Sequence, residues 1–492
     1  MKTLGNTLPR RFKAKASGAI TAGKPLIVKA DGDVAQISGN DLTQGSANEF
    51  DTNNSSYYAV IYDSSNARFV IVNRSGSSGP TKGRVAQIDG SDNSVSTGTA
   101  VNVRASADLA YNDGAYDANA ARVLVAFMDN TVGGQKGGAA VAQVNASDNS
   151  ISFGSTVYFE TGKSMYIAVT YDSNAQKCVV FFSDNGDSMK GKARVATITP
   201  GDNSVSFGTV ATFENGGTED TNAAFNSSLN KHHIIYKDID NSNYGTIVTG
   251  TVSGTSITFN TPVVFNSGST AEPNVGYDVT NDKLLLVFKD ASVGGSPGTA
   301  IVATASSGGG YTLGSKVVFE SGHTRTPNPV YNPDTGKFTV FYMDDADSDK
   351  GKFVVGTISG TSVTFGDPVI FNDADTSGSA KLYLQAAYDT TLDRNLVVYT
   401  GENNNYYGTA KVVRNESTNL TSENFIGLAE YAAADTETAT VLIKGGVSTT
   451  QSSLTPGQTY FVQGDGTLAL TADDPSVTAG TAVTSTKLIV KG

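Results

Sequence analysis

The side chains of this chain that could do chemistry are mostly aspartates at a fixed place in a repeated pattern. An aromatic residue, a variable residue and an aspartate close an apolar run five times, and two further equivalent positions carry Asn73 and Gly401. Such a ring could bind a cation or sugar hydroxyls. An aspartate at a strand end more often accepts hydrogen bonds from the N–H groups of the following turn, and the regular repetition favours this capping role. The five aspartates are Asp129, Asp184, Asp238, Asp290 and Asp344.

Calcium is the one metal for which the sequence offers a candidate site. Asp345, Asp347 and Asp349 have the spacing of a calcium loop, but the glycine comes one place late, and position 12 of the loop is Gly356 instead of Glu. No flanking helices are predicted. We therefore expect a solvated acidic loop and no cofactor, with a loose Ca²⁺ site as the alternative.

A catalytic set is difficult to assemble from this sequence. The chain has three histidines, one cysteine and no tryptophan. The aspartate boxes of sialidase-like propellers need tryptophan, so they cannot occur, and a lone cysteine excludes a disulfide framework and a cysteine-built zinc site. His232 and His233 fall in a predicted strand, and no nucleophile motif accompanies His323. We therefore predict that the protein is not an enzyme.

The elements that position these side chains recur with a period of about 54 residues. Each unit holds about four short apolar runs separated by Gly, Asn, Asp and Ser, which is typical of strands and turns. Four strands per unit and seven units predict an all-β fold, a seven-bladed β-propeller over residues 38–424; a solenoid is the alternative. The first run of each unit ends in Tyr62-Asp63, Tyr111-Asn112, Tyr171-Asp172, Phe225-Asn226, Tyr277-Asp278, Tyr331-Asn332 and Tyr388-Asp389.

Two sets of loops differ from unit to unit: those after the aromatic-x-Asp element and those that link one unit to the next. In four-stranded antiparallel blades both sets lie on one face, and variable loops on a rigid scaffold are where binding residues concentrate. Loop tyrosines stack on sugars or on protein edges, with packing between units as the alternative. The predicted binding residues on this face are Tyr166, Tyr244, His323, Arg325, Tyr406 and Tyr407.

A second, shorter repeat occupies the two ends of the chain. Residues 19–37 and 453–470 share apolar-Thr-x-Gly, a valine and Asp-Gly at the same spacing, and Asp-Gly between apolar runs indicates a hairpin. The pattern predicts a small duplicated β-sandwich or barrel-like module, with copy 1 split into 17–37 and 425–447 and copy 2 at 448–492. Residues 1–16 are an N-terminal tail. Either 41–50 or 419–425 closes the last blade.

Charge and hydropathy exclude two kinds of partner. The formal net charge is −12, which argues against nucleic-acid binding. No apolar run reaches about 18 residues, so membrane insertion is not expected. The basic N-terminus lacks an apolar core and does not match a secretory signal.

The end modules resemble a small β domain of virion proteins of tailed bacteriophages, especially marine and cyanobacterial ones. The resemblance rests on SLTPGQTYFVQGDGTLALTADDPSVTAGTAVTSTKLIVKG, residues 453–492, together with 17–37 and 425–447. It implies a non-enzymatic structural protein of the virion, a tail fibre, appendage or capsid decoration subunit, assembled in the host cytoplasm. It further implies a homo-oligomer that contacts other capsid or tail proteins and displays the propeller for host attachment to a surface glycan or protein.

Two other functions remain open at this point. A carbohydrate-binding, lectin-type propeller is the alternative to a virion subunit, and a propeller glycoside hydrolase is the third candidate.

Overall fold

The computed structural model describes residues 10–29, 31–37, 41–375, 384–401, 405–416, 420–473 and 475–491. These residues form strands and turns, and their only helical elements are two short 3₁₀ helices, η1 (Asn185–Asp187) and η2 (Asp345–Asp347). No helix in the described ranges is long and apolar enough to cross a membrane. The chain divides into two compact units, residues 1–43 with 415–492, and residues 44–414.

The larger unit consists of antiparallel sheets whose strands follow one another from the inside outward. The innermost strands are β5 (Asn48–Asp63), β10 (Leu109–Asp117), β14 (Val157–Asp172), β18 (Ala211–Asn226), β22 (Val263–Asp278), β27 (Thr324–Asn332) and β32 (Leu384–Asp389). The second strands are β6 (Arg68–Ser75), β11 (Arg122–Asp129), β15 (Lys177–Asp184), β19 (Lys231–Asp238), β23 (Lys283–Asp290), β28 (Lys337–Asp344) and β33 (Arg394–Gly401).

The third strands and the short outer strands complete each sheet. The third strands are β7 (Thr81–Ile88), β12 (Lys136–Asn145), β16 (Lys190–Thr199), β20 (Tyr244–Ser253), β24 (Gly298–Ala305), β29 (Lys350–Ser359) and β34 (Tyr407–Glu416). The outer strands are β4 (Asp41–Gln44), β8 (Val95–Thr97), β9 (Val101–Asn102), β13 (Ser150–Phe153), β17 (Ser204–Phe207), β21 (Ser256–Phe259), β25 (Tyr311–Leu313), β26 (Val317–Glu320), β30 (Ser362–Phe365) and β31 (Val369–Asp375).

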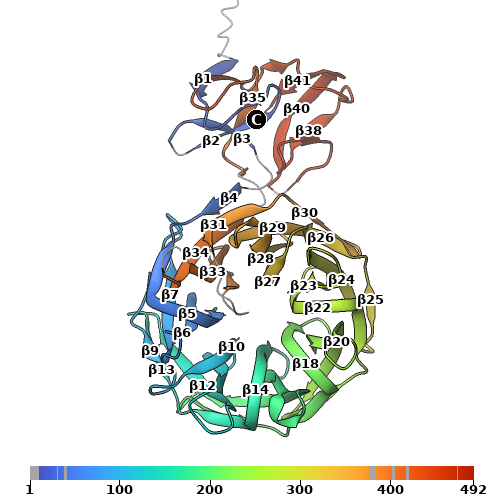
Figure 1. The fold of residues 1–492 in the computed structure, drawn as a ribbon. Helices are drawn as coiled ribbons and strands as arrows, with labels where there is room; N and C mark the ends of the chain where they lie inside the picture. The colour runs from blue at the N-terminus through green and yellow to red at the C-terminus, as the bar shows by residue number, and fades with distance from the viewer. Residues whose placement is uncertain are drawn as a thin grey trace, which may run out of the picture. The chain divides into compact units, whose positions relative to one another are not determined.

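The sheets form a closed ring. Each innermost strand lies beside the next in the order β5, β10, β14, β18, β22, β27, β32, and β32 lies again beside β5 (Figure 1). Apolar side chains of neighbouring sheets fill the space between them; Phe181 of one sheet, for example, packs in one cluster with Ile234 and Tyr236 of the next. The prediction of an all-β propeller is confirmed.

In the second repeat unit, the end of the first strand that was predicted from the sequence is wrong. The strand β10 ends at Tyr116-Asp117, and Asp117 accepts the turn hydrogen bond from Asn119 as the equivalent aspartates do. The prediction placed Tyr111-Asn112 at this position. The two dipeptides are locally similar, and only the pairing of Asp117 with Arg122 of β11 identifies the strand end.

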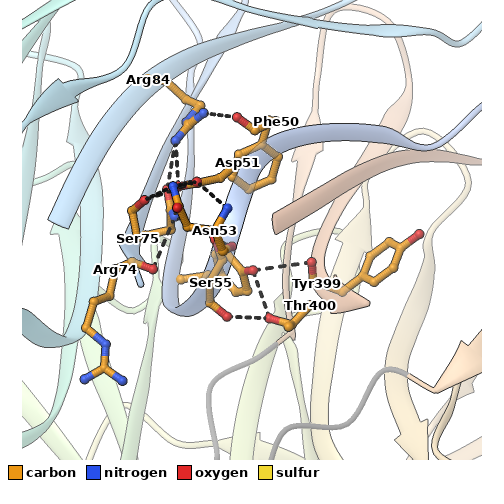
Figure 2. Close-up of polar contacts among 11 residues, drawn as sticks. Phe50, Asp51, Asn53, Ser55, Arg74, Ser75, Arg84, Tyr399 and Thr400 are labelled. Carbon is orange, nitrogen blue, oxygen red and sulfur yellow. Dashed lines mark hydrogen bonds and ion pairs between the residues drawn. The ribbon is translucent and has the colours of Figure 1, made fainter. Parts of the chain in front are cut away.

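The last sheet receives its outer strand from the start of the propeller. The first half of β5 pairs with β34, with Asn54 opposite Tyr407, and β4 also pairs with β34. Of the two segments that could close the ring, the one at 41–50 therefore does so. Figure 2 shows the polar network behind this strand, in which Asp51 contacts Asn53, Ser75 and Arg84.

A glycine on the third strand lies beneath a phenylalanine of the neighbouring outer strand in sheet after sheet. A Cβ atom added at Gly298 would lie 2.5 Å from the ring of Phe319, and one at Gly351 would lie 2.5 Å from the ring of Phe371. The same contact recurs at Gly137, Gly191 and Gly245. These glycines allow the aromatic ring to pack directly on the backbone of the third strand.

Gly298→Ala is therefore expected to lower the free energy of unfolding by about 1–3 kcal/mol, because overpacking forces the ring of Phe319 to move. Gly201→Ala is the matched control, since a Cβ there would have no atom within 4 Å. Urea melts of both variants measure the difference. A loss at Gly298 no larger than that at Gly201 would contradict the close packing of this pair.

The smaller unit holds two five-stranded sheets. The first has the order β1-β36-β35-β2-β3 and the second the order β37-β41-β40-β38-β39. Leu428 and Leu442 of the first sheet pack with Leu454, Tyr460 and Leu488 of the second part. The strands are β1 (Arg11–Lys15), β2 (Pro25–Val28), β3 (Val34–Gln36), β35 (Phe425–Ala429), β36 (Thr438–Leu442), β37 (Val447–Ser448), β38 (Thr459–Val462), β39 (Leu468–Ala469), β40 (Val477–Thr484) and β41 (Lys487–Val490).

Residues 11–15, which were predicted to belong to an N-terminal tail, form an edge strand of the first sheet. The strand β1 pairs with β36, with Arg11 opposite Leu442, and the Arg11 guanidinium forms an ion pair with Glu430. Its alternating exposed and half-buried residues explain why it reads as a polar segment in the sequence. Residues 1–9 lie outside the described residues.

Candidate functional site

A β-bulge interrupts the innermost strands at an equivalent position. In β5 the pairing with β6 shifts between Ser56 and Ala59, and β14 shifts in the same way between Met165 and Ala168. The bulged residue has a positive φ, a conformation that costs energy for residues other than glycine and that gathers at functional sites. The residues and their φ values are Tyr57 (54°), Tyr111 (52°), Tyr166 (48°), Asp220 (51°), Glu272 (52°) and Thr326 (46°).

These six bulged residues all line one cavity of about 430 Å³, here called the central pocket. Every innermost strand from β5 to β32 contributes to its wall. Among its described lining residues are three tyrosines, three carboxylates and several amides, but no Lys, Arg or His. A pocket of this size with a few polar groups that converge on it is the usual form of a small-molecule site.

One part of the wall is aromatic. The ring centroids of Tyr57 and Tyr111 are 5.4 Å apart, and those of Tyr111 and Tyr166 are 5.1 Å apart. The Arg74 guanidinium lies 4.6 Å from the ring centroid of Tyr57.

Burial raises the pKa of Tyr111 to about 12, with Tyr57, Asp220 and Glu219 adding to the shift. Burial also raises the pKa of Tyr166, and the charges of Asp220 and Glu219 raise it further. Both hydroxyls are therefore neutral donors at pH 7.

The other part of the wall is acidic. Asp113 accepts a hydrogen bond of 2.7 Å from the N–H of Val169, while Asp220 accepts one of 3.0 Å from Glu272 N–H. Glu272 in turn accepts from the N–H of Thr326 at 2.5 Å. Each of these bonds joins two different sheets, so the carboxylates also hold the wall together.

Asp113 has the most perturbed carboxyl group of the pocket. Burial raises its pKa to about 7, although the hydrogen bonds from the N–H groups of Val169 and Gly114 favour its charged form. A carboxyl group that titrates near neutral pH can both donate and accept a proton in a reaction.

Asn112 and Thr221, both buried in the wall, each have a polar atom without a hydrogen-bond partner, and Thr326 Oγ1 is a third such atom. Asn112 is 3% exposed and uses its amide nitrogen to donate to the carbonyl of Tyr57 at 2.7 Å, which leaves its Oδ1 without a partner. The Oγ1 of Thr221, a residue 4% exposed, also has none. Buried polar atoms are rarely left unsatisfied. Both residues line the pocket, so a polar ligand can supply the missing bonds.

Of the six predicted binding residues, Tyr166 lines the central pocket. The prediction placed it in a loop, but it lies within β14 at the bulge. The other five are not among the lining residues. Tyr244 begins β20, Tyr407 begins β34, and Tyr406 precedes it in the turn after β33. Both His323 and Arg325 pair with Asp345, the arginine at 2.8 Å.

The three aspartates proposed for a loose calcium site have other roles. Asp345 binds His323 and Arg325, and Asp347 pairs with Lys352 at 2.8 Å. Asp349 has a positive φ of 54° in the turn before β29. In the described part of the chain, no group of three or more His, Cys, Asp or Glu side chains could hold a metal ion.

The repeated aspartates at the ends of the second strands cap the turns that follow. Asp184 accepts from the N–H of Gly186 at 3.0 Å, and Asp344 accepts from Ala346 at 3.1 Å. Each also pairs with a lysine of the third strand, Lys192 or Lys352, at 2.7 Å. These contacts agree with the capping interpretation.

One buried histidine has neighbours of the types found in a catalytic triad. The Nδ1 of His232 lies 2.8 Å from Thr170 Oγ1, and its Nε2 lies 3.3 Å from Asp172 Oδ2. All three residues are buried and none lines the central pocket. Burial lowers the pKa of His232 despite the nearby Asp172. The group therefore belongs to the packing between sheets.

The sequence contains a signal for the residues that were missed. Tyr57 stands six residues before Asp63, the end of its strand, and each of the other bulged residues stands at the same distance from its own strand end. In successive repeat units this position is occupied by Tyr, Tyr, Tyr, Asp, Glu and Thr. A column of polar and aromatic residues within a predicted inner strand indicates a wall facing a cavity.

No family model and no curated protein matches the chain. Several solved structures are similar. A periplasmic gluconolactonase of Pseudomonas aeruginosa is 10% identical, with 75% of this chain and 96% of that chain covered and a TM-score of 0.43. A putative 6-phosphogluconolactonase of Bacteroides fragilis is 12% identical, with 75% of this chain and 97% of that chain covered and a TM-score of 0.47. A GH93 α-L-arabinofuranosidase of Fusarium graminearum is 11% identical, with 60% of this chain and 90% of that chain covered and a TM-score of 0.41.

These comparisons correct two predictions. The chain was expected to be a non-enzymatic structural protein of a phage virion, whereas the three solved structures are named as two lactonases and a glycoside hydrolase. At these identities and TM-scores the similarities carry nothing about a substrate.

Proposed function

We propose that the propeller binds a short saccharide in the central pocket and hydrolyses a glycosidic bond in it, with Asp113 as the acid. The observation that carries this proposal is the composition of the wall, in which three neighbouring tyrosine rings stand beside three carboxylates, one of them with a pKa near neutral.

The aromatic part of the wall suits the apolar faces of sugar rings. Tyr57, Tyr111 and Tyr166 follow one another along the wall, with centroid separations of 5.1–5.4 Å and ring planes inclined by 59° and 62°. Tyrosine offers an apolar ring for packing and a hydroxyl for hydrogen bonding. Asn112 Oδ1 and Thr221 Oγ1, which have no partner, can bind sugar hydroxyls.

The acidic part of the wall suits hydrolysis. Protonated Asp113 donates its proton to the glycosidic oxygen while the bond from that oxygen to the anomeric carbon breaks. Water supplies the hydroxyl group at the anomeric carbon, and its remaining proton passes to a carboxylate, for which Asp220 is the candidate. Two carboxyl groups with different protonation states are the usual equipment for this reaction.

The binding half of the proposal is tested by calorimetry with tetrasaccharides of glucose, galactose, mannose, arabinose and glucosamine units in α and β linkage. We expect at least one to bind, and Tyr111→Ala to weaken that binding by about fivefold or more, since packing of a sugar face on one aromatic ring is worth about 1 kcal/mol or more.

The controls separate this site from general effects. Tyr111→Phe keeps the ring and is expected to keep most of the affinity, and Tyr431→Ala removes a tyrosine of the smaller unit that is 63% exposed. Failure of every tetrasaccharide to bind would overturn the proposal. Binding without release of reducing ends would overturn its hydrolytic half.

A further inference from the structure

We infer that the saccharide taken by the central pocket carries a protonated amine, and that the pocket rejects sugars that carry a carboxylate or phosphate. This inference rests on the proposed function and makes its substrate class more specific. It follows from the charges of the wall, from the partners of the nearby cations and from unsatisfied polar atoms in the wall.

The wall contains acidic groups without basic ones. Asp113, Asp220 and Glu272 line the pocket, and the described lining residues include no Lys, Arg or His. Opposite charges at contact distance attract strongly in a protein pocket, where the effective dielectric constant is far below that of water. Asp113 is partly protonated near pH 7, and the charge of Glu272 is offset by Lys289 at 3.2 Å. Most of the negative charge of the wall therefore comes from Asp220, and it favours an ammonium group over an anionic one.

The cations nearest the bulges are bound to carboxylates. Lys237 and Lys289 lie on second strands opposite Glu219 and Ala271, next to the bulges. Lys237 pairs with Glu219 at 2.8 Å and Lys289 with Glu272 at 3.2 Å. Around the same ring, Arg74 pairs with Asp108 at 3.6 Å and Arg325 with Asp345 at 2.8 Å. An anionic ligand would have to displace one of these partners.

An organic amine fits the wall better than a metal ion does. In the part of the chain that the structure describes, no three His, Cys, Asp or Glu side chains are grouped closely enough to hold a metal. The acidic groups are instead spread along a wall that also presents tyrosine faces, which attract ammonium groups. The buried Oδ1 of Asn112, which has no partner, can accept a hydrogen bond from an ammonium N–H.

The test compares tetrasaccharides that share one sugar backbone and differ only in the charge of a substituent. The probes are β-1,4-linked tetrasaccharides on glucose and galactose backbones, each as the 2-amino sugar, the neutral sugar and the uronate. On the backbone that binds, we expect the amine to bind about tenfold more tightly than the neutral sugar and the uronate to bind least. Raising the salt concentration from 0.05 to about 0.5 M should reduce the amine's advantage.

A matched pair of variants locates the effect. Asp220→Asn is expected to remove most of the preference for the amine, and asparagine tolerates the positive φ of this position. Asp367→Asn removes the same charge from the exposed segment between β30 and β31 and is expected to leave the preference unchanged. Equal losses in both variants would mean that the net charge of −12 attracts the amine nonspecifically, and would overturn the inference.

The remaining outcomes distinguish the two proposals. If neutral tetrasaccharides bind and the amines bind no more tightly, the inference is wrong and the proposed function stands. If no tetrasaccharide of this set or of the wider screen binds, the proposed function fails and the inference fails with it.

Discussion

Asp51→Ala is expected to lower the free energy of unfolding of the propeller by about 3–5 kcal/mol, because it leaves a buried arginine without its carboxylate. Asp51 and Arg84 are 5% and 4% exposed, and their side chains are 3.2 Å apart. Asn73 donates to the same carboxylate at 2.8 Å, and Ser75 donates at 3.1 Å (Figure 2). Removal of Asp51 therefore leaves several buried donors unsatisfied.

This network lies where the two ends of the ring meet. Asp51 belongs to the part of β5 that pairs with the last third strand, opposite Gly408. Arg84 lies on β7 of the first sheet, with its guanidinium 4.7 Å from the ring centroid of Phe50. The ion pair therefore joins the last sheet to the first, and its loss is expected to weaken the closure of the ring.

The pH dependence of this effect has a definite sign. Burial alone would raise the pKa of Asp51, but hydrogen bonds from Asn73 and Asn53 and the charge of Arg84 bring it below its usual value. A carboxylate with a depressed pKa in the folded state stabilises the fold above its unfolded pKa, and that stability is lost as the pH falls through the folded pKa. The wild type and Asp51→Ala should therefore differ most at pH 7 and less below about pH 4.

Urea melts at pH 7 and pH 3 measure both effects. The double variant Asp51→Ala with Arg84→Met is the control, since it removes the uncompensated charge and should recover part of the loss. A loss below about 1 kcal/mol at pH 7 would mean that the network does not support ring closure.

Asp113→Asn is expected to lower the rate of saccharide hydrolysis by about 10²–10⁴-fold, the usual contribution of a positioned acid or base. Asparagine can still accept the hydrogen bond that Val169 N–H gives to Asp113 at 2.7 Å. The bulge and the affinity for saccharide should therefore change much less than the rate does. The tetrasaccharide that binds the wild type serves as the substrate.

The pH profile separates a catalytic role of Asp113 from a structural one. Burial raises the pKa of Asp113 to about 7, so the proton that the acid donates is present below this pH and lost above it. The wild-type rate should fall as the pH rises through about 7, and the residual rate of Asp113→Asn should lack this limb. Asp367→Asn, in the exposed segment between β30 and β31, is the control. An unchanged rate for Asp113→Asn would remove Asp113 from the mechanism.

Much of the fold could be predicted from the sequence, because its signals are local. An aspartate such as Asp344 bonds to the backbone two residues later, at Ala346, so the same short sequence forms the same turn in each unit. Alternating apolar residues between such turns indicate strands. Repetition then indicates a propeller, because one sheet cannot bury both of its faces and several sheets in a ring can.

The candidate site depended on tertiary structure. Tyr166 has a loop-like polar neighbourhood in the sequence, yet it lies in β14, where a bulge turns its side chain toward the central pocket. A bulge shifts the alternation of a strand by one residue, so period-two reasoning assigns the following residues to the wrong face. Tyr111-Asn112 was misplaced as a strand end for a different reason, its local similarity to Tyr116-Asp117, which only the pairing with β11 resolves.

Long-range partners were also beyond local reasoning. Asp113 receives its hydrogen bond from Val169, and Asp51 meets Arg84, in each case across two different sheets. The sequence alone determined which residue types recur and where the strands end, since both depend on neighbours a few residues apart. Which carboxyl groups are buried away from water, and which pair with a cationic side chain, was decided only by closure of the ring. Both properties depend on segments that are distant in the chain.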